Sequence, residues 1–121
     1  MDELRAAPIE PFGLPMPRDP RLVRIARALL DDPGKRWSLG EWAQWAGVSE
    51  RTLSRRFVAE TGFTYTIWWQ RARMMRALEM LAEGETVTNA AFDLGYDSVS
   101  AFIALFKRTL GVTPSAYFPR S

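Results

Sequence analysis

Six residues of this chain recur in the same order about fifty positions further on. The first set is Ala43, Gly47, Leu53, Phe57, Gly62 and Thr64, and the second set is Ala91, Gly95, Phe102, Phe106, Gly111 and Thr113. The offset is 48 for the first two pairs and 49 for the other four, so one residue is added between Gly95 and Phe102. This regularity indicates an internal duplication, which restricts the chain to a fold with two similar units.

Each repeat has the pattern of two helices joined by a tight turn. The alanine lets the two helices approach closely, and the glycine permits a turn with positive φ. A serine follows each glycine, Ser49 in the first repeat and Ser98 in the second. Its side chain can accept a hydrogen bond from a free amide of the next helix. The pattern therefore predicts a duplicated helix–turn–helix, with Leu53 and Phe57 facing inward because they lie four residues apart.

Capping and helix-ending residues predict an all-α fold of about seven helices. Asp19-Pro20 begins the first helix, which reaches about Asp32. Ser38 and Glu41 form a capping box at the start of the second helix. The later helices are expected to begin at Ser49, Thr64 or Thr66, Thr88, Ser98 and Thr113, and to end at Gly62, Glu83-Gly84, Gly95, Leu110 and Tyr117.

These elements define a tail and one domain with two lobes. Five of the eight prolines lie in residues 1–20, so residues 1–18 are expected to be a linker or tail. The domain is expected to span 19–118. Its parts are a first helix–turn–helix at about 38–61, a long linker helix at about 65–83, a second helix–turn–helix at about 87–110 and a final short helix at 113–118.

Positive charge is concentrated in the first repeat and the helix after it. The net charge is +2, yet the stretch from Arg51 to Arg76 holds six arginines and one acid, Glu60. Such local asymmetry favours a polyanion as partner, and a solvated charged surface is the alternative.

The spacing of the charges suits DNA. Arg51, Ser54 and Arg55 share one face of their helix. A helix fits the major groove of B-DNA, and arginine can bind guanine through two hydrogen bonds. Arg56 lies to the side and is better placed for phosphate.

Cysteine and histidine are both absent from the chain. Disulfides and thiol chemistry are therefore excluded, and a zinc site would lack its commonest ligands. The usual general base of hydrolases is also missing. An enzyme that uses only carboxylates stays an alternative, but we expect no enzyme, no catalytic site, no metal and no cofactor. No apolar run approaches the roughly 20 residues that span a bilayer, and no signal peptide opens the chain. We expect a cytoplasmic protein with no membrane partner.

The stretch from about Asp19 to Phe118 resembles the C-terminal DNA-binding domain of AraC/XylS-family transcription regulators. The most specific part is AAFDLGYDSVSAFIALFKRTLGVTPSAYF. SLGEWAQWAGVSERTLSRRF resembles the family's first helix–turn–helix, and WWQRARMMRALEMLAEG resembles its linker helix. The resemblance covers about 100 of the 121 residues.

The resemblance implies that two recognition helices enter successive major grooves, about 34 Å apart. A linker helix of about 18 residues is about 27 Å long, which fits that separation. By position, the base-facing residues are Arg51, Thr52, Ser54, Arg55, Val99, Ser100, Ile103 and Ala104. The phosphate-contacting residues are Ser38, Arg56, Gln70, Arg71, Ser98, Lys107 and Arg108.

The second recognition helix departs from many members of the family. Ala104 stands where arginine is frequent, and Ser100 is the polar residue left to read bases. Val99, Ile103 and Ala104 can meet thymine methyl groups, or they form a weakly specific surface. The sequence therefore does not establish that the two lobes contribute equally to recognition of the base sequence.

The sequence is thus expected to encode a sequence-specific regulator that binds double-stranded DNA. The alternative is a protein-interaction module that acts on RNA polymerase or another regulator. No segment is long enough to be the effector-binding domain that many relatives carry, and we expect this domain to be a monomer.

Overall fold

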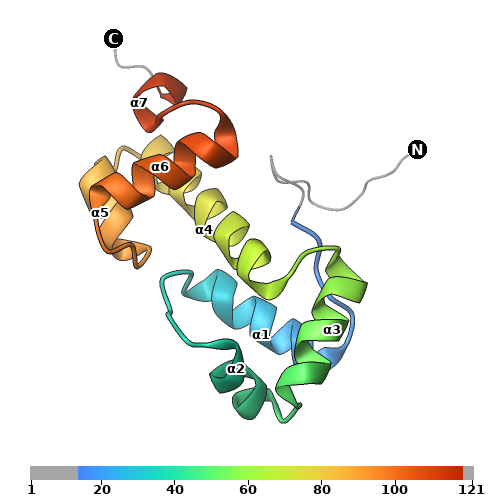
Figure 1. The fold of residues 1–121 in the computed structure, drawn as a ribbon. Helices are drawn as coiled ribbons and strands as arrows, with labels where there is room; N and C mark the ends of the chain where they lie inside the picture. Colours follow the sequence, from blue (N-terminus) through green and yellow to red (C-terminus); the bar gives the residue numbers. More distant parts are fainter. Residues whose placement is uncertain (1–13, 119–121) are drawn as a thin grey trace.

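The structure, a computed structural model, describes residues 14–118, and over this range it contains seven helices and no strand (Figure 1). The predicted all-α fold is confirmed. The helices are α1 (Pro20–Asp31), α2 (Leu39–Ala46), α3 (Glu50–Thr61), α4 (Tyr65–Ala82), α5 (Val87–Asp93), α6 (Val99–Leu110) and α7 (Pro114–Tyr117). Between residues 14 and 118, no helix is long and apolar enough to cross a bilayer. The expected tail at 1–18 lies mostly outside the described residues.

Every helix begins at a side chain that accepts a hydrogen bond from a backbone amide of its first turn. These caps are Asp19, Ser38, Ser49, Thr64, Thr86, Ser98 and Thr113. The predicted capping box of Ser38 and Glu41 is present. The expectation that Thr88 begins the fifth helix is wrong, because Thr86 Oγ1 accepts from the amide of Asn89 at 3.0 Å. Two threonines lie two residues apart here, and the sequence alone does not rank them as caps.

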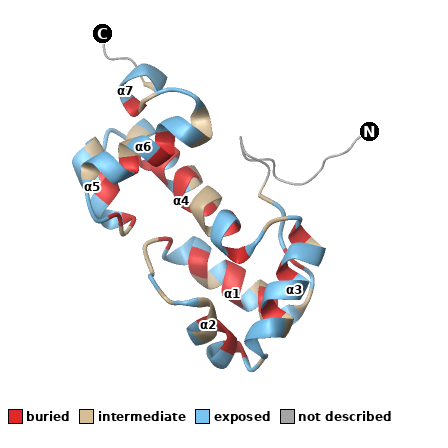
Figure 2. Ribbon diagram, in the orientation of Figure 1, coloured by how far each residue is buried: buried red, intermediate tan, exposed pale blue. Residues whose placement is uncertain are grey.

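The helices enclose two separate hydrophobic cores. The first core contains Leu22, Ile25, Ala26, Leu29, Trp42, Ala43, Ala46, Leu53, Phe57, Tyr65, Trp68 and Ala72. The second contains Met74, Ala77, Leu78, Met80, Ala90, Ala91, Leu94, Tyr96, Phe102, Leu105 and Phe106. The two groups of buried residues form two lobes, with α4 running from one to the other (Figure 2). The first half of α4 thus belongs to the first lobe and its second half to the second lobe.

The duplication seen in the sequence is a duplication of structure. Ala43 and Ala91 are buried, and both turn glycines adopt positive φ, 74° at Gly47 and 83° at Gly95. The helices α3 and α6 both end at glycines in the left-handed region, Gly62 and Gly111. The caps Ser38 and Thr86 add a further pair at the offset of 48.

The helix that precedes each helix–turn–helix is also equivalent in the two lobes. The apolar residues of α1 are Leu22, Ile25, Ala26 and Leu29, and those of α4 at an offset of 52 are Met74, Ala77, Leu78 and Leu81. α1 contacts α2 as α4 contacts α5. Each recognition helix is therefore held by a three-helix lobe of the same design.

The packing of the second core predicts how much two phenylalanines contribute to the free energy of unfolding. Phe106 is 0% exposed and lies 5.9 Å from Phe102 and 5.8 Å from Tyr117, measured between ring centroids. Phe106→Ala should lower the free energy of unfolding by about 3–5 kcal/mol, because it removes apolar burial and leaves a cavity. Phe92→Ala is the control, since Phe92 is 57% exposed and its loss should cost less than about 0.5 kcal/mol. Urea denaturation measures both, and equal losses would contradict the assignment of the second core.

Candidate nucleic-acid interface

The helix α3 is fixed on its inner face by apolar burial. Leu53 and Phe57 are both 0% exposed, as their spacing predicted. The Phe57 ring meets Trp68 edge-on, with 5.6 Å between ring centroids. At the end of the helix, the Thr61 hydroxyl donates to the Phe57 carbonyl at 2.7 Å. These contacts set which face of α3 points outward.

The outer face of α3 carries unpaired positive charge. Arg51, Ser54 and Arg55 are all exposed. Among residues 14–118, neither Arg51 nor Arg55 takes part in an ion pair. Thr52 is half-buried, and its amide donates to the Ser49 side chain. Two free guanidinium groups on the first half of a recognition helix match the requirement for reading guanine in the major groove.

The sequence analysis missed Val58 on this same face. Its side chain is 42% exposed, one turn beyond Ser54. The signal was available, because Val58 follows Arg51 by seven residues and Ser54 by four, which places all three on one helix stripe. An exposed valine there can contact a thymine methyl group.

The outer face of α6 differs from that of α3. At the offset of 49, Ser100 replaces Arg51, Ile103 replaces Ser54 and Ala104 replaces Arg55. Ser100 and Ala104 are exposed, whereas Val99 and Ile103 are half-buried and pack against the second core. Part of the apolar surface expected to face bases is therefore engaged in the protein's own packing.

The positive charge of α6 lies at the other end of the helix. Lys107 and Arg108 are exposed in its last turn. Their counterparts in α3 are Val58 and Ala59. Recognition helices meet base edges mainly with their N-terminal residues, and the expected contacts of the α3 arginines with bases and of the α6 cations with the backbone stay predictions.

Arg56 makes a contact that the sequence did not predict. Its Nη1 lies 2.7 Å from Asp19 Oδ2, and its Nε lies 3.8 Å from Glu60 Oε2. Glu60 Oε1 also accepts hydrogen bonds from the amides of Arg18, at 2.7 Å, and Asp19, at 2.9 Å. This network ties the segment before α1 to α3. Arg56 thus shares its guanidinium with Asp19, and a phosphate contact through its remaining N–H groups, as the sequence suggested, stays a prediction.

The same network lowers the pKa of two carboxyl groups, those of Asp19 and Glu60. The hydrogen bond from the Arg21 side chain, aided by the charges of Arg21 and Arg56, lowers the pKa of Asp19 well below its usual value. The amides of Asp19 and Arg18 lower the pKa of Glu60. Both carboxylates therefore stay ionised to a lower pH than an ordinary Asp or Glu, and they hold the segment before α1 on the first lobe. The indole of Trp68 adds a hydrogen bond to the Pro15 carbonyl at 2.7 Å.

The remaining residues expected at phosphate lie at two helix starts and on α4. Ser38 and Ser98 are exposed caps of α2 and α6, where helix amides favour anions. Gln70 and Arg71 are half-buried on α4, and the Arg71 guanidinium stacks 4.8 Å above the Phe63 ring. Their contact with phosphate stays a prediction.

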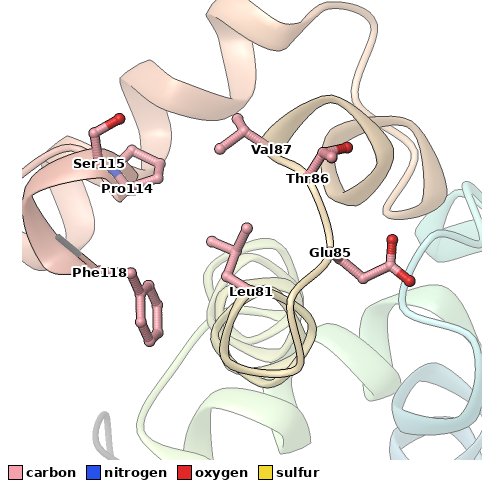
Figure 3. Close-up of a pocket in the computed structure, with 7 residues that line it drawn as sticks. All are labelled: Leu81, Glu85, Thr86, Val87, Pro114, Ser115 and Phe118. Atoms are coloured by element: carbon pink, nitrogen blue, oxygen red, sulfur yellow. The ribbon is translucent and has the colours of Figure 1, made fainter. Parts of the chain in front are cut away.

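A pocket of about 330 Å³ opens on the second lobe, and none of the residues that line it belongs to α6 (Figure 3). Its lining comes from the end of α4, the start of α5 and α7: Leu81, Glu85, Thr86, Val87, Pro114, Ser115 and Phe118. The first lobe places large aromatic residues at the equivalent positions, with Trp37 for Glu85, Tyr65 for Pro114 and Trp69 for Phe118. The first lobe therefore carries larger side chains than the second at these three positions.

Comparison with known proteins places this architecture in a family. A protein-family model described as a helix-turn-helix domain matches residues 42–120. The transcriptional regulator NimR of Escherichia coli K12 is 39% identical over 119 residues, which is 98% of this chain and 44% of NimR. A putative AraC-like transcription regulator of Streptomyces lividans is 36% identical over 100 residues, 82% of this chain and 33% of that protein. The chain thus spans less than half the length of these relatives.

A solved structure shows the same fold with DNA bound. The DNA-binding domain of AdpA, described as a global transcriptional factor in complex with a target DNA, superposes with a TM-score of 0.73 at 29% sequence identity. The match covers 83% of this chain and 90% of that domain.

The network around Asp19 predicts a dependence of stability on pH. The pKa of folded Asp19 is lowered, so its stabilising effect is present above the usual value of 3.8 and is lost as the pH falls through the lower, folded-state pKa. Asp19→Asn keeps a helix cap but removes the charge. It should lower the melting temperature at about pH 7 and reduce the further fall below about pH 4.

Asp31→Asn is the matched control, because Asp31 is exposed on the same helix and makes no ion pair with any described residue. Melting curves followed by circular dichroism between about pH 2.5 and about pH 7 measure both variants. A melting profile of Asp19→Asn that coincides with that of the unchanged protein would contradict a stabilising role for the network.

Proposed function

This chain belongs to the AraC-type family of helix-turn-helix transcription regulators, and from that premise we propose that it binds double-stranded DNA sequence-specifically. In this proposal α3 and α6 enter successive major grooves on one face of the duplex. The protein regulates transcription through the DNA site that it selects.

The observation that carries the proposal is the outer face of α3. Arg51 and Arg55 are exposed, and no acid among residues 14–118 pairs with either. They lie beside Ser54 on the first half of a helix whose other face is buried. A rigid helix that presents free guanidinium groups in this position supports base readout, because the bidentate contact to guanine needs a defined direction.

The two lobes take unequal parts in the proposed complex. α3 offers arginines for bases, whereas α6 offers Ser100 and Ala104 for bases, with Lys107 and Arg108 for phosphate. Phosphate contacts fix register and orientation, and base contacts carry sequence information. The first lobe therefore supplies most of the polar recognition, and the second lobe mainly adds affinity and position.

A protein-interaction role is the second candidate, and the pocket of the second lobe favours it. The pocket is lined mostly by apolar groups, and none of its lining residues belongs to α3 or α6. A partner such as RNA polymerase could insert a side chain there. The two functions are compatible, and chemical-shift mapping separates them: random duplex DNA at low salt should shift amides at 51–56, whereas a protein partner should shift those at 81–87 and 114–118.

The first test is selection of bound sites from a random duplex library, followed by titration of the selected site. Arg55→Ala should weaken binding by about 1–3 kcal/mol and relax the sequence preference at one base position. Affinity should fall steeply with salt for every variant, because phosphate contacts release counterions. Fluorescence anisotropy measures both effects.

Arg27→Ala is the matched control, since it removes one exposed arginine from α1 and leaves α3 unchanged. It should shift neither the selected sequence nor the preference at any single base. Failure of the selection to enrich any sequence, with equal affinity for all duplexes, would overturn the proposal of specific binding.

A second prediction concerns the asymmetry of the two recognition helices. Arg51→Ala or Arg55→Ala should change the selected sequence more than Ile103→Ala does, because Ile103 is partly engaged in the second core. Ile103→Ala should instead lower the melting temperature, as expected for a truncated packing residue. Repeating the site selection with each variant measures the effect, and a larger change in sequence preference from Ile103→Ala would refute the asymmetry.

A further inference from the structure

The two lobes also touch each other directly, beside α4. The loop between α1 and α2 approaches the turn between α5 and α6 (Figure 1). We call this contact the seam, and it consists of Pro33, Gly34, Arg36, Trp69, Arg73 and residues 94–97. None of these residues lies on the outer face of α3 or α6.

The closest approach in the seam is between two glycines. A Cβ atom on Gly34 would lie 2.6 Å from the Asp93 carbonyl oxygen, and one on Gly95 would lie 2.8 Å from the Gly34 carbonyl oxygen. Both distances are shorter than real Cβ contacts, and the obstructing atoms are backbone atoms. The seam therefore closes only because neither residue has a side chain, and any larger residue at 34 must push the two loops apart.

Arg73 joins the two cores at the same place. Its side chain is buried on α4, and its guanidinium carbon lies 4.1 Å from the centroid of the Trp69 ring and 4.2 Å from that of Tyr96. Trp69 packs on the first core and Tyr96 belongs to the second. Arg73 Nη1 also donates to the Leu94 carbonyl at 3.4 Å. A planar guanidinium can stack on two rings at once, which an ammonium group does less well.

Two further bonds hold the α1–α2 loop in the seam. The Trp69 indole donates to the Pro33 carbonyl at 2.7 Å. Arg36 Nη1 lies 2.7 Å from Asp97 Oδ1 across the seam, in an exposed ion pair. One helix alone permits bending and rotation of one lobe against the other. A second point of attachment beside that helix removes this freedom.

We propose that the seam fixes the position of α6 relative to α3 and so makes the spacing between the two half-sites a determinant of DNA specificity. The second part of this statement rests on the proposed function. Gly34 and Arg73 are its positioning residues, and neither needs to touch DNA. Adding one base pair moves a half-site by about 3.4 Å and turns it by about 34° around the duplex, and a fixed pair of lobes cannot follow that change.

The first experiment measures the two lobes without DNA. The chain contains no cysteine, so Ala59→Cys on α3 and Ala116→Cys on α7 allow specific labelling with two spin labels at exposed positions. The parent protein should give one narrow distance distribution. Gly34→Ala and, separately, Arg73→Met should broaden or displace it. Arg76→Met is the matched control, because it removes an exposed arginine of α4 that pairs only with Glu79 on the same helix among the described residues, and it should leave the distribution unchanged.

The second experiment uses unlabelled protein and the selected duplex, with the half-sites moved apart or together by one and two base pairs. The parent should prefer its best spacing over the next by about tenfold or more. In Gly34→Ala and Arg73→Met this preference should fall below about threefold, while the selected half-site sequence stays the same. Arg76→Met should keep the parent's preference.

The outcomes separate the two proposals. Distance distributions and spacing preferences that match the parent in both folded seam variants would overturn the seam as the positioning element. A changed distance distribution together with a parent that selects no sequence would support the seam and overturn the proposed function. Thermal melting shows that each variant is folded, and two variants on different elements ensure that at least one reports on the seam.

Discussion

The structure depends on one helix that must bury residues in two different cores. α4 places Trp68 and Ala72 in the first core and Met74 and Ala77 in the second. Since hydrophobic burial is the main favourable term in folding, neither lobe can be completed without its half of α4. The separation of the two lobes along α4 is thus a consequence of core formation, because the residues that complete the two cores lie on opposite halves of this helix.

The duplication shows which features a helix–turn–helix lobe must keep. The close-packed alanine, the left-handed glycine, the serine cap and two buried residues of the second helix are present in both lobes. The outer face is free of these requirements, because solvent or DNA covers it. The outer faces of α3 and α6 have accordingly diverged in charge, and so has the site that holds Trp69 in one lobe and Phe118 beside a pocket in the other.

Local features of the structure were largely predictable. Five of the seven caps were predicted outright and a sixth, Thr64, as one of two alternatives, because a cap is decided by a side chain and an amide two or three residues away. The inward faces of α3 and α6 followed from a spacing of four residues. The prediction of Thr88 as a cap was wrong because Thr86 and Thr88 are both suitable caps, and the local sequence does not rank them.

The sequence by itself determined the all-α class, the two repeats, the turn glycines and the residues available to each recognition helix, because these depend on short-range geometry. Only the tertiary structure decided which residues far apart in the sequence come into contact and which side chains stay exposed. It engaged Arg56 with Asp19, left Arg51 and Arg55 without an acidic partner among residues 14–118, partly buried Ile103, and brought Gly34 against Gly95 beside Arg73. The members of the two pairs, Arg56 with Asp19 and Gly34 with Gly95, are separated by tens of residues along the chain, and no sequence periodicity indicates that they meet. They arise when two cores form on one helix and their loops come within contact distance.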